Sequence, residues 1–183
     1  MKKKRSIINK QLWSSFIALS GYFFESITVK RVNGADFFTK IKYRALKARI
    51  EKLKEGTPGQ WGTMRVEQML HHVNLSMGSG QGFYDLPDES YFFSKTIIKW
   101  IVINLYNAQP KGLRLPLCMA ISPESRFDFE DEKKQLLKIL DAASNATLQS
   151  QWNPHCYFGT LTVNQWGKLC SMHLDYHLRQ FSA

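Results

Sequence analysis

The chain has 183 residues and a formal net charge of +10; 44% of its residues are hydrophobic and 22% are charged. These values fit one globular domain with a sizeable core, and they exclude a disordered tail protein, a collagen-like fibre and a polytopic membrane protein. The odd number of cysteines (Cys118, Cys156 and Cys170) excludes a framework in which every cysteine is paired within the chain. We therefore expect three reduced thiols and a reducing, cytoplasmic location.

The basic excess lies entirely in the first 55 residues. They hold 14 Lys and Arg against 4 Asp and Glu, whereas the remaining residues hold 11 of each kind. The charge distribution suggests a basic amino-terminal extension, residues 1–35, followed by a domain over residues 36–183. Because the body of the chain is neutral, we do not expect nucleic acid to be its partner.

The amino-terminal extension leaves three alternatives open. Four basic residues at positions 2–5 are followed by an uncharged stretch over residues 12–24. This pattern fits a secretory signal, an amphipathic helix on an anionic membrane surface or an acidic partner, or an extension that packs weakly on the domain. The stretch is too short to predict a transmembrane helix. A membrane-associated or exported protein is thus the alternative to a cytoplasmic one.

In four segments, apolar residues recur every three to four positions, which is the period of an α-helix. We expect helices that begin near Asp36, Thr63, Asp128 and Thr162, where each of these side chains can cap the first turn. The first ends before Gly56, the second near Met77 and the third near Ala143, while the fourth runs almost to the carboxyl terminus. Thr162 and Gln165 have the spacing of a capping box.

A fifth segment, residues 96–106, is apolar on most sides. Its β-branched residues allow a buried strand, but its length favours a buried helix. Residues 108–127 contain Pro110, Gly112, Pro116 and Pro123, so no long regular element fits there. Five helices and no clear strand predict an all-α bundle.

Two histidines, His173 and His177, lie four residues apart on the last predicted helix. They share a face with the apolar residues of that helix, so they point toward the core, where an imidazole must be hydrogen-bonded or bind a metal. A third ligand would come from the second predicted helix, and the apolar period favours His72 over His71. Either these histidines bind a divalent metal, or they are polar residues of the core.

Other residues near the three histidines have less defined roles. Cys170 shares the face of His173 and is a candidate fourth ligand, whereas Asp175 would hydrogen-bond a ligand or lie on the surface. No general base is evident, and Tyr157, Tyr176 and His155 are candidates only if the fold brings them close.

Several motifs resemble a DinB-like branch whose function is unknown. Trp61-Gly62-Thr63-Met64 with residues 68–72 resembles its second-helix signature, and residues 154–159 with residues 173–181 resemble its last loop and helix. Two positions depart from the pattern: Tyr176 stands where relatives often have His, and Cys156 where they often have Pro.

The resemblance implies a four-helix bundle in up-down-down-up order, here with an additional helix and the amino-terminal extension. It also implies a divalent metal held by His72, His173 and His177. The metal would be Zn²⁺, Ni²⁺ or Fe²⁺, with at least one open position.

Such a site can support a metal-dependent thiol transferase or hydrolase acting on a small thiol or another small molecule, in a monomer or a homodimer. The alternative is a non-catalytic binding module whose basic amino-terminal segment docks to a membrane surface or an acidic partner.

Overall fold

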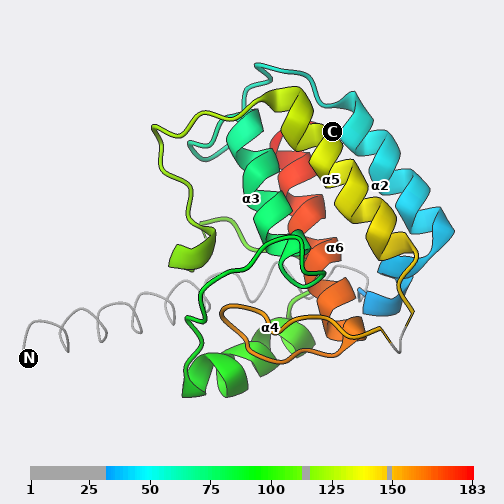
Figure 1. Ribbon diagram of the computed structural model, residues 1–183, viewed down its shortest axis with the longest axis vertical. Coiled ribbons are helices and arrows are strands. Elements are labelled where there is room, and N and C mark those ends of the chain that lie inside the picture. Colours follow the sequence, from blue (N-terminus) through cyan, green and yellow to red (C-terminus); the bar gives the residue numbers. More distant parts are fainter. Residues whose placement is uncertain (1–31, 113–115, 148–149) are drawn as a thin grey trace, which may run out of the picture.

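The computed structural model describes residues 32–112, 116–147 and 150–183, and this part of the chain is helical (Figure 1). The α-helices are α2 (Lys40–Lys52), α3 (Val66–Gly78), α4 (Lys99–Leu105), α5 (Phe129–Ser144) and α6 (Val163–Gln180). Short 3₁₀ turns form η1 (Gly34–Phe38) and η3 (Leu117–Met119), and a π-helical turn, η2 (Ser94–Ile98), leads into α4. The described residues contain no strand, only an isolated bridge between His155 and Gly159. The prediction of an all-α protein is confirmed.

The predicted caps of the last two long helices are confirmed. Asp128 accepts a hydrogen bond from the Asp131 N–H at 2.9 Å and thereby satisfies one free donor at the start of α5. Thr162 and Gln165 form the reciprocal capping box at the start of α6.

The predicted starts of the first two helices are wrong by a few residues. Asp36 lies within η1, and Thr39 caps α2 instead, where its hydroxyl accepts from the Lys42 N–H. The helix α3 begins at Val66 and not at Thr63, because Arg65 is extended and its N–H donates to the Gln68 side chain.

The core lies where α2, α3, α5 and α6 meet, and these helices lie side by side in Figure 1. Fully buried side chains come from all four helices; they include Leu46, Ile50, Met69, Leu70, Leu136, Ile139, Leu140, Trp166 and Leu174. The short η1 packs on α6 through two glycines. A Cβ on Gly167 would lie 2.2 Å from the Gly34 carbonyl oxygen, so this approach requires glycine.

The segment predicted as a buried helix is helical but not buried. All seven residues of α4 are exposed or half-buried, and Trp100 exposes 58% of its surface. The helix lies at the edge of the bundle (Figure 1), and lysines attach it there. Lys99 donates to the Thr160 carbonyl, and the buried Lys168 on α6 donates to the Ile103 carbonyl. Apolar composition alone did not distinguish a core helix from an exposed one.

The expectation of three reduced thiols is wrong for two of them. Cys118 and Cys156 form a disulfide that joins η3 to the loop before α6, and Cys170 is free and buried. A search of the described part of the chain found no helix with the length and hydrophobicity needed to cross a bilayer. The predictions for residues 1–31 of the amino-terminal extension lie outside the described residues.

Candidate metal centre

Three histidines converge between α3 and α6. His72 projects from α3, and His173 and His177 project from successive turns of α6. The ring centroids lie 4.9 Å apart for His72 and His173, 5.1 Å for His72 and His177, and 4.7 Å for the two on α6. One ring nitrogen from each histidine lies within 4.8 Å of the others, so the group could hold a metal ion. The structure brings together the three histidines that the sequence singled out.

Each of the three rings uses its Nδ1 atom to contact an oxygen. The acceptor for His72 is the Met119 carbonyl at 2.9 Å, for His173 the Gln109 side-chain oxygen at 2.7 Å, and for His177 the Gln180 side-chain oxygen at 2.8 Å. Because an oxygen of this kind accepts, each Nδ1 must carry the proton, and each Nε2 therefore presents a lone pair. We assign the tautomers from this network.

The three Nε2 atoms are buried and have no hydrogen-bond partner among the described residues. His72 and His177 are almost fully buried, and His173 keeps an exposed edge although its Nε2 atom is covered. Buried polar atoms in proteins are nearly always paired, so three unpaired acceptors in one place are unusual. They mark a point to which a Lewis acid or a hydrogen-bond donor would be attracted.

The surroundings keep all three imidazoles neutral. Burial lowers the pKa of His72 to about 4, although the Met119 carbonyl opposes the shift. Burial and the neighbouring His72 lower the pKa of His177 to about 3. Burial and the other histidines also place the pKa of His173 well below its ordinary value. Neutral imidazole is the form that binds metals, so no proton needs to be removed near pH 7.

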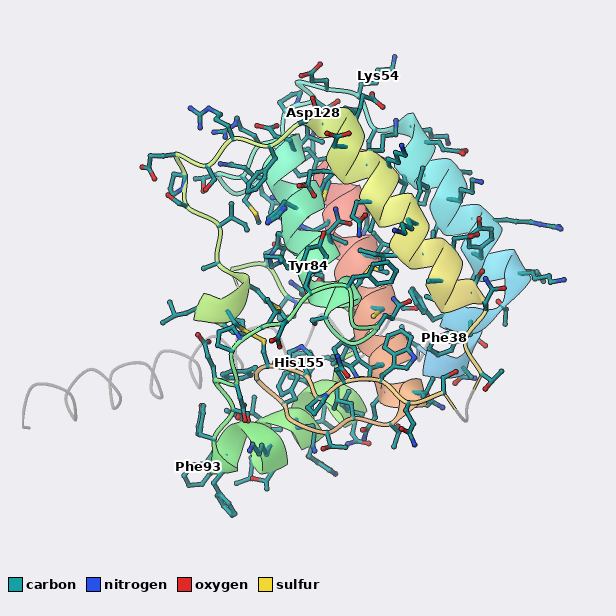
Figure 2. All side chains as sticks on the ribbon, in the orientation of Figure 1. Phe38, Lys54, Tyr84, Phe93, Asp128 and His155 are labelled. Carbon is teal, nitrogen blue, oxygen red and sulfur yellow. A yellow bond between two sulfur atoms is a disulfide. The ribbon has the colours of Figure 1, made fainter. Side chains whose placement is uncertain are left out.

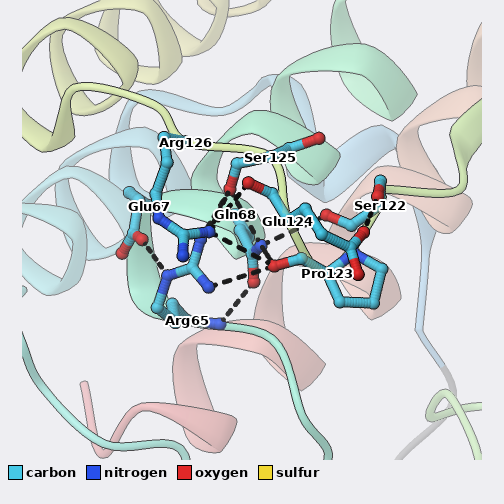
Figure 3. Close-up of polar contacts among 8 residues, drawn as sticks. All are labelled: Arg65, Glu67, Gln68, Ser122, Pro123, Glu124, Ser125 and Arg126. Carbon is cyan, nitrogen blue, oxygen red and sulfur yellow. Dashed lines mark hydrogen bonds and ion pairs between the residues drawn. The ribbon is translucent and has the colours of Figure 1, made fainter.

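A set of polar contacts holds the loop that carries Met119 against α3 (Figure 3). The buried Gln68 side-chain nitrogen lies within 3.3 Å of the carbonyl oxygens of Ser122, Pro123 and Ser125. Arg65 donates to the Pro123 and Ser125 carbonyls as well. Gln68 precedes His72 by one helical turn, so the helix that supplies His72 also positions the loop that orients its ring.

His71, the neighbour of His72, lies outside this group. Its Nδ1 contacts the Glu132 carboxylate on α5 at 2.8 Å, and its ring stacks on Phe127 with centroids 3.9 Å apart. Glu132 also accepts from the Asn74 side chain. The choice of His72 over His71 agrees with the apolar period of α3, because the two positions are about 100° apart on the helix.

Cys170 and Asp175, the other two residues that the sequence placed near the three histidines, are not members of the histidine group. Burial raises the pKa of the Cys170 thiol to about 12, so it is neutral. Asp175 is bound by Arg49 at 2.7 Å and Arg179 at 2.9 Å. Burial alone would raise the pKa of Asp175, but the hydrogen bond from Arg49 and the charges of Arg179 and Arg49 outweigh it and lower the pKa.

The three candidate general bases have other partners. The Tyr176 hydroxyl accepts from the Trp61 indole N–H at 2.9 Å. Tyr157 contacts the Tyr91 hydroxyl, and burial together with this contact raises its pKa. Burial lowers the pKa of His155 to about 4, and its Nδ1 accepts from two backbone N–H groups. These hydrogen bonds do not link a base to the histidine group, although the Tyr176 ring packs against His177 with centroids 4.9 Å apart and His155 is close enough to His173 to contribute to its lowered pKa.

The chain matches one family model, described as a protein of unknown function (DUF1569), over residues 38–183. The chain belongs to this family. Searches of curated proteins and of solved structures found no match.

All six residues of the histidine network lie within the DUF1569 match, but sequence reasoning missed three of them. Gln180 follows His177 by three residues on α6, a spacing that could have identified it. Gln109 and Met119 lie in irregular segments and reach the site only through the fold, so no periodic pattern marks them.

Proposed function

We propose that this DUF1569 protein is a metalloprotein that holds a divalent transition metal through the Nε2 atoms of His72, His173 and His177. The observation that carries the proposal is a group of three histidines with ring nitrogens within 4.8 Å of one another, in which each Nε2 atom is buried and has no hydrogen-bond partner in the described residues. Zn²⁺, Ni²⁺ and Fe²⁺ all accept imidazole ligands, so the donor set fits each of them.

The alternative, a polar core without metal, is energetically unfavourable. A buried acceptor that has lost water and gained no partner costs about 1–3 kcal/mol. Three such atoms in one cluster would cost several times as much, and a small hydrophobic residue at each position would avoid the cost. A metal would accept all three Nε2 lone pairs at once. The separate oxygen that holds each Nδ1–H fits this role, because metal-binding histidines usually donate their other ring N–H to an oxygen that fixes the ring orientation.

The residues of this chain would fix the ligands and keep them neutral. Gln109, Gln180 and the Met119 carbonyl hold each Nδ1–H, which aims the opposite nitrogen inward. A metal held by three neutral ligands would retain an open position at which it could acidify water or bind a thiolate. We accordingly propose a hydrolase or a thiol transferase that acts on a small molecule, and a small thiol is the first substrate class to screen.

We also propose that the bundle has the DinB-like up-down-down-up order. Two observations support it: α2 and α6 run toward the top of the view in Figure 1, and α3 and α5 run toward the bottom. In this order the histidine group would lie between the second and last helices of the bundle, α3 and α6. A homodimer is part of the same proposal, whereas the Cys118–Cys156 disulfide removes the support that reduced thiols gave to a cytoplasmic location.

Elemental analysis of the purified protein tests the metal assignment. After incubation with Zn²⁺, Ni²⁺ or Fe²⁺ and removal of loosely bound ions, we expect about one metal per chain. His173→Ala is the most informative variant because His173 is the least buried of the three and its loss perturbs folding least. We expect it to retain no metal while its far-ultraviolet circular dichroism stays helical.

The matched control is His71→Ala, which removes the histidine next to His72 on α3 that lies outside the group. This variant should keep its metal. Equal metal content in wild type and His173→Ala, or loss in the His71→Ala control alone, would refute the assignment.

A further inference from the structure

The Cys118–Cys156 disulfide lies one residue away from an atom that orients the histidine group. Cys118 precedes Met119 within η3, and the Met119 carbonyl oxygen accepts the Nδ1 proton of His72 at 2.9 Å. Because the two residues are consecutive, a bond that holds the Cys118 sulfur also restricts where the Met119 carbonyl can lie. The disulfide therefore helps to fix the oxygen that orients the His72 ring.

The other end of the disulfide is anchored to α6. The Cys156 carbonyl accepts from the Glu89 N–H at 2.8 Å, and the preceding residue, His155, forms two backbone hydrogen bonds with Gly159, each of 2.9 Å. The buried His155 ring packs on Trp166 of α6 with centroids 5.2 Å apart, and Figure 2 shows His155 beside the lower part of that helix. The disulfide thus links the turn that orients the histidine of α3 to the helix that carries the other two histidines.

The other contacts of η3 leave its position dependent on this bond. The backbone hydrogen bonds of the turn join residues 116–120 to one another and do not attach them to another element. Leu117 is 78% exposed, and Met119 is the buried residue of the turn. The contacts with α3 that Figure 3 shows begin at Ser122, three residues after Met119. Once the disulfide is broken, the turn keeps its internal hydrogen bonds but can move relative to His72.

We propose that the Cys118–Cys156 disulfide is a redox switch of the histidine group, so that its reduction by a dithiol weakens metal binding and its reformation restores it. This inference rests on the metal centre proposed as the function. A thiolate of the dithiol attacks the sulfur of Cys118, the less buried of the two cysteines, and forms a mixed disulfide while Cys156 leaves as a thiolate and takes up a proton. The second thiol of the dithiol then displaces Cys118, which also ends as a thiol, and the dithiol leaves as a cyclic disulfide.

The expected effect on affinity follows from the role of the Met119 carbonyl. This oxygen is the outer hydrogen-bond partner of His72, and loss of such a partner typically lowers metal affinity 10–100-fold. The side chains of Gln109 and Gln180 hold the other two rings and are not part of the disulfide loop contacts. Reduction should therefore weaken metal binding at least tenfold without abolishing it.

The zinc affinity of the full chain in its two redox states tests the proposal. One sample stays oxidised, and the other is reduced with dithiothreitol, which is then removed in the absence of air. Competition with a chromogenic chelator should give a dissociation constant for Zn²⁺ at least tenfold higher in the reduced sample, with recovery after reoxidation. The double variant Cys118→Ala, Cys156→Ala, measured without reductant, should bind as weakly as the reduced protein, and it has no released thiols that could bind zinc themselves.

Two control variants separate the switch from general effects. Cys170→Ala removes the thiol that lies outside the disulfide, and it should show the same difference between the two redox states as the wild type. Ile50→Val removes one buried methyl group from α2, which carries none of the three histidines, so it lowers stability without touching the site. It should bind zinc like the oxidised wild type. All samples should keep a helical circular dichroism spectrum.

Nitrogen NMR of the metal-free protein detects the switch independently of any metal. In the oxidised protein, His72 should carry its proton on Nδ1, because the Met119 carbonyl accepts it. Reduction should mix the two tautomers of His72. His177 is the internal control and should keep its Nδ1 proton in both states, because its acceptor, Gln180, lies three residues away on the same helix.

Equal zinc affinity in the two redox states, or in the double variant and the oxidised wild type, would overturn the switch and leave the metal centre intact. A His72 tautomer that does not change on reduction would also overturn it. Loss of helicity on reduction would make the disulfide a structural bond and not a switch. The absence of zinc binding in both states would instead refute the metal centre, and the switch with it.

Discussion

Replacing Gln109 by Leu should weaken metal binding without unfolding the protein. The Gln109 oxygen accepts the Nδ1 proton of His173 at 2.7 Å, and leucine of similar size removes that acceptor. A donor left without its partner costs about 1–3 kcal/mol, and loss of a ligand's outer hydrogen bond typically costs 10–100-fold in metal affinity. Both estimates agree on a dissociation constant raised by about one to two orders of magnitude. Gln109→Glu, which keeps an acceptor, should bind at least as tightly as the wild type.

Competition between the protein and a chromogenic chelator gives these dissociation constants directly. Gln81→Leu is the matched control, because Gln81 is a half-buried loop glutamine whose side-chain nitrogen donates to the Met77 carbonyl, away from the histidine group. We expect the control to bind like the wild type and Gln109→Leu to bind at least tenfold more weakly. A folded Gln109→Leu protein with wild-type affinity would refute the role of this hydrogen bond in orienting His173.

Three further predictions follow from other parts of the structure. Acid should destabilise the metal-free protein between pH 6.5 and about 4, by about 1.4 kcal/mol per pH unit for each buried histidine. In this pH range His155 takes up a proton in the unfolded chain but not in the folded protein, where its pKa is about 4. Urea melts of His155→Gln should therefore show a free energy of unfolding that depends less steeply on pH. Thiol titration of the denatured, unreduced protein should find one free thiol, and Cys118→Ser should lower the free energy of unfolding by about 2–4 kcal/mol because the disulfide spans 38 residues; three titratable thiols would contradict the pairing. Gly167→Ala should cost about 1–3 kcal/mol by displacing η1 from α6, and an unchanged melting temperature would show that this close approach is absent.

The sequence alone predicted where a helix begins when the capping residues lie close together in the sequence. The Asp128 cap and the Thr162–Gln165 capping box are set by residues three positions apart, and both were predicted correctly. The start of α3 was misplaced because Gln68 reaches back to the Arg65 N–H, an interaction that competes with the expected Thr63 cap. The exposure of α4 could not be predicted, since hydrophobicity reports what a helix could bury and not whether the fold gives it a neighbour.

The histidine group could be anticipated because its geometry is helical. The four-residue spacing of His173 and His177 places them on one face, and the apolar period of α3 selects His72. Of the oxygens that accept from the ring Nδ1–H groups, the sequence could indicate only that of Gln180, which lies three residues from His177 on the same helix. The Met119 carbonyl depends on a loop pinned by Gln68 from 54 or more residues away, and no pattern in the sequence records such a contact.

X-ray absorption spectroscopy of the zinc-loaded protein tests the metal assignment most directly. We predict a first shell with three imidazole nitrogens at about 2.0–2.1 Å, completed by light atoms from solvent. The spectrum of His177→Ala should lose this signature, and the spectrum of His71→Ala should keep it. A sulfur ligand at about 2.3 Å, as Cys170 would supply, or a shell of oxygens alone, would contradict a three-histidine centre.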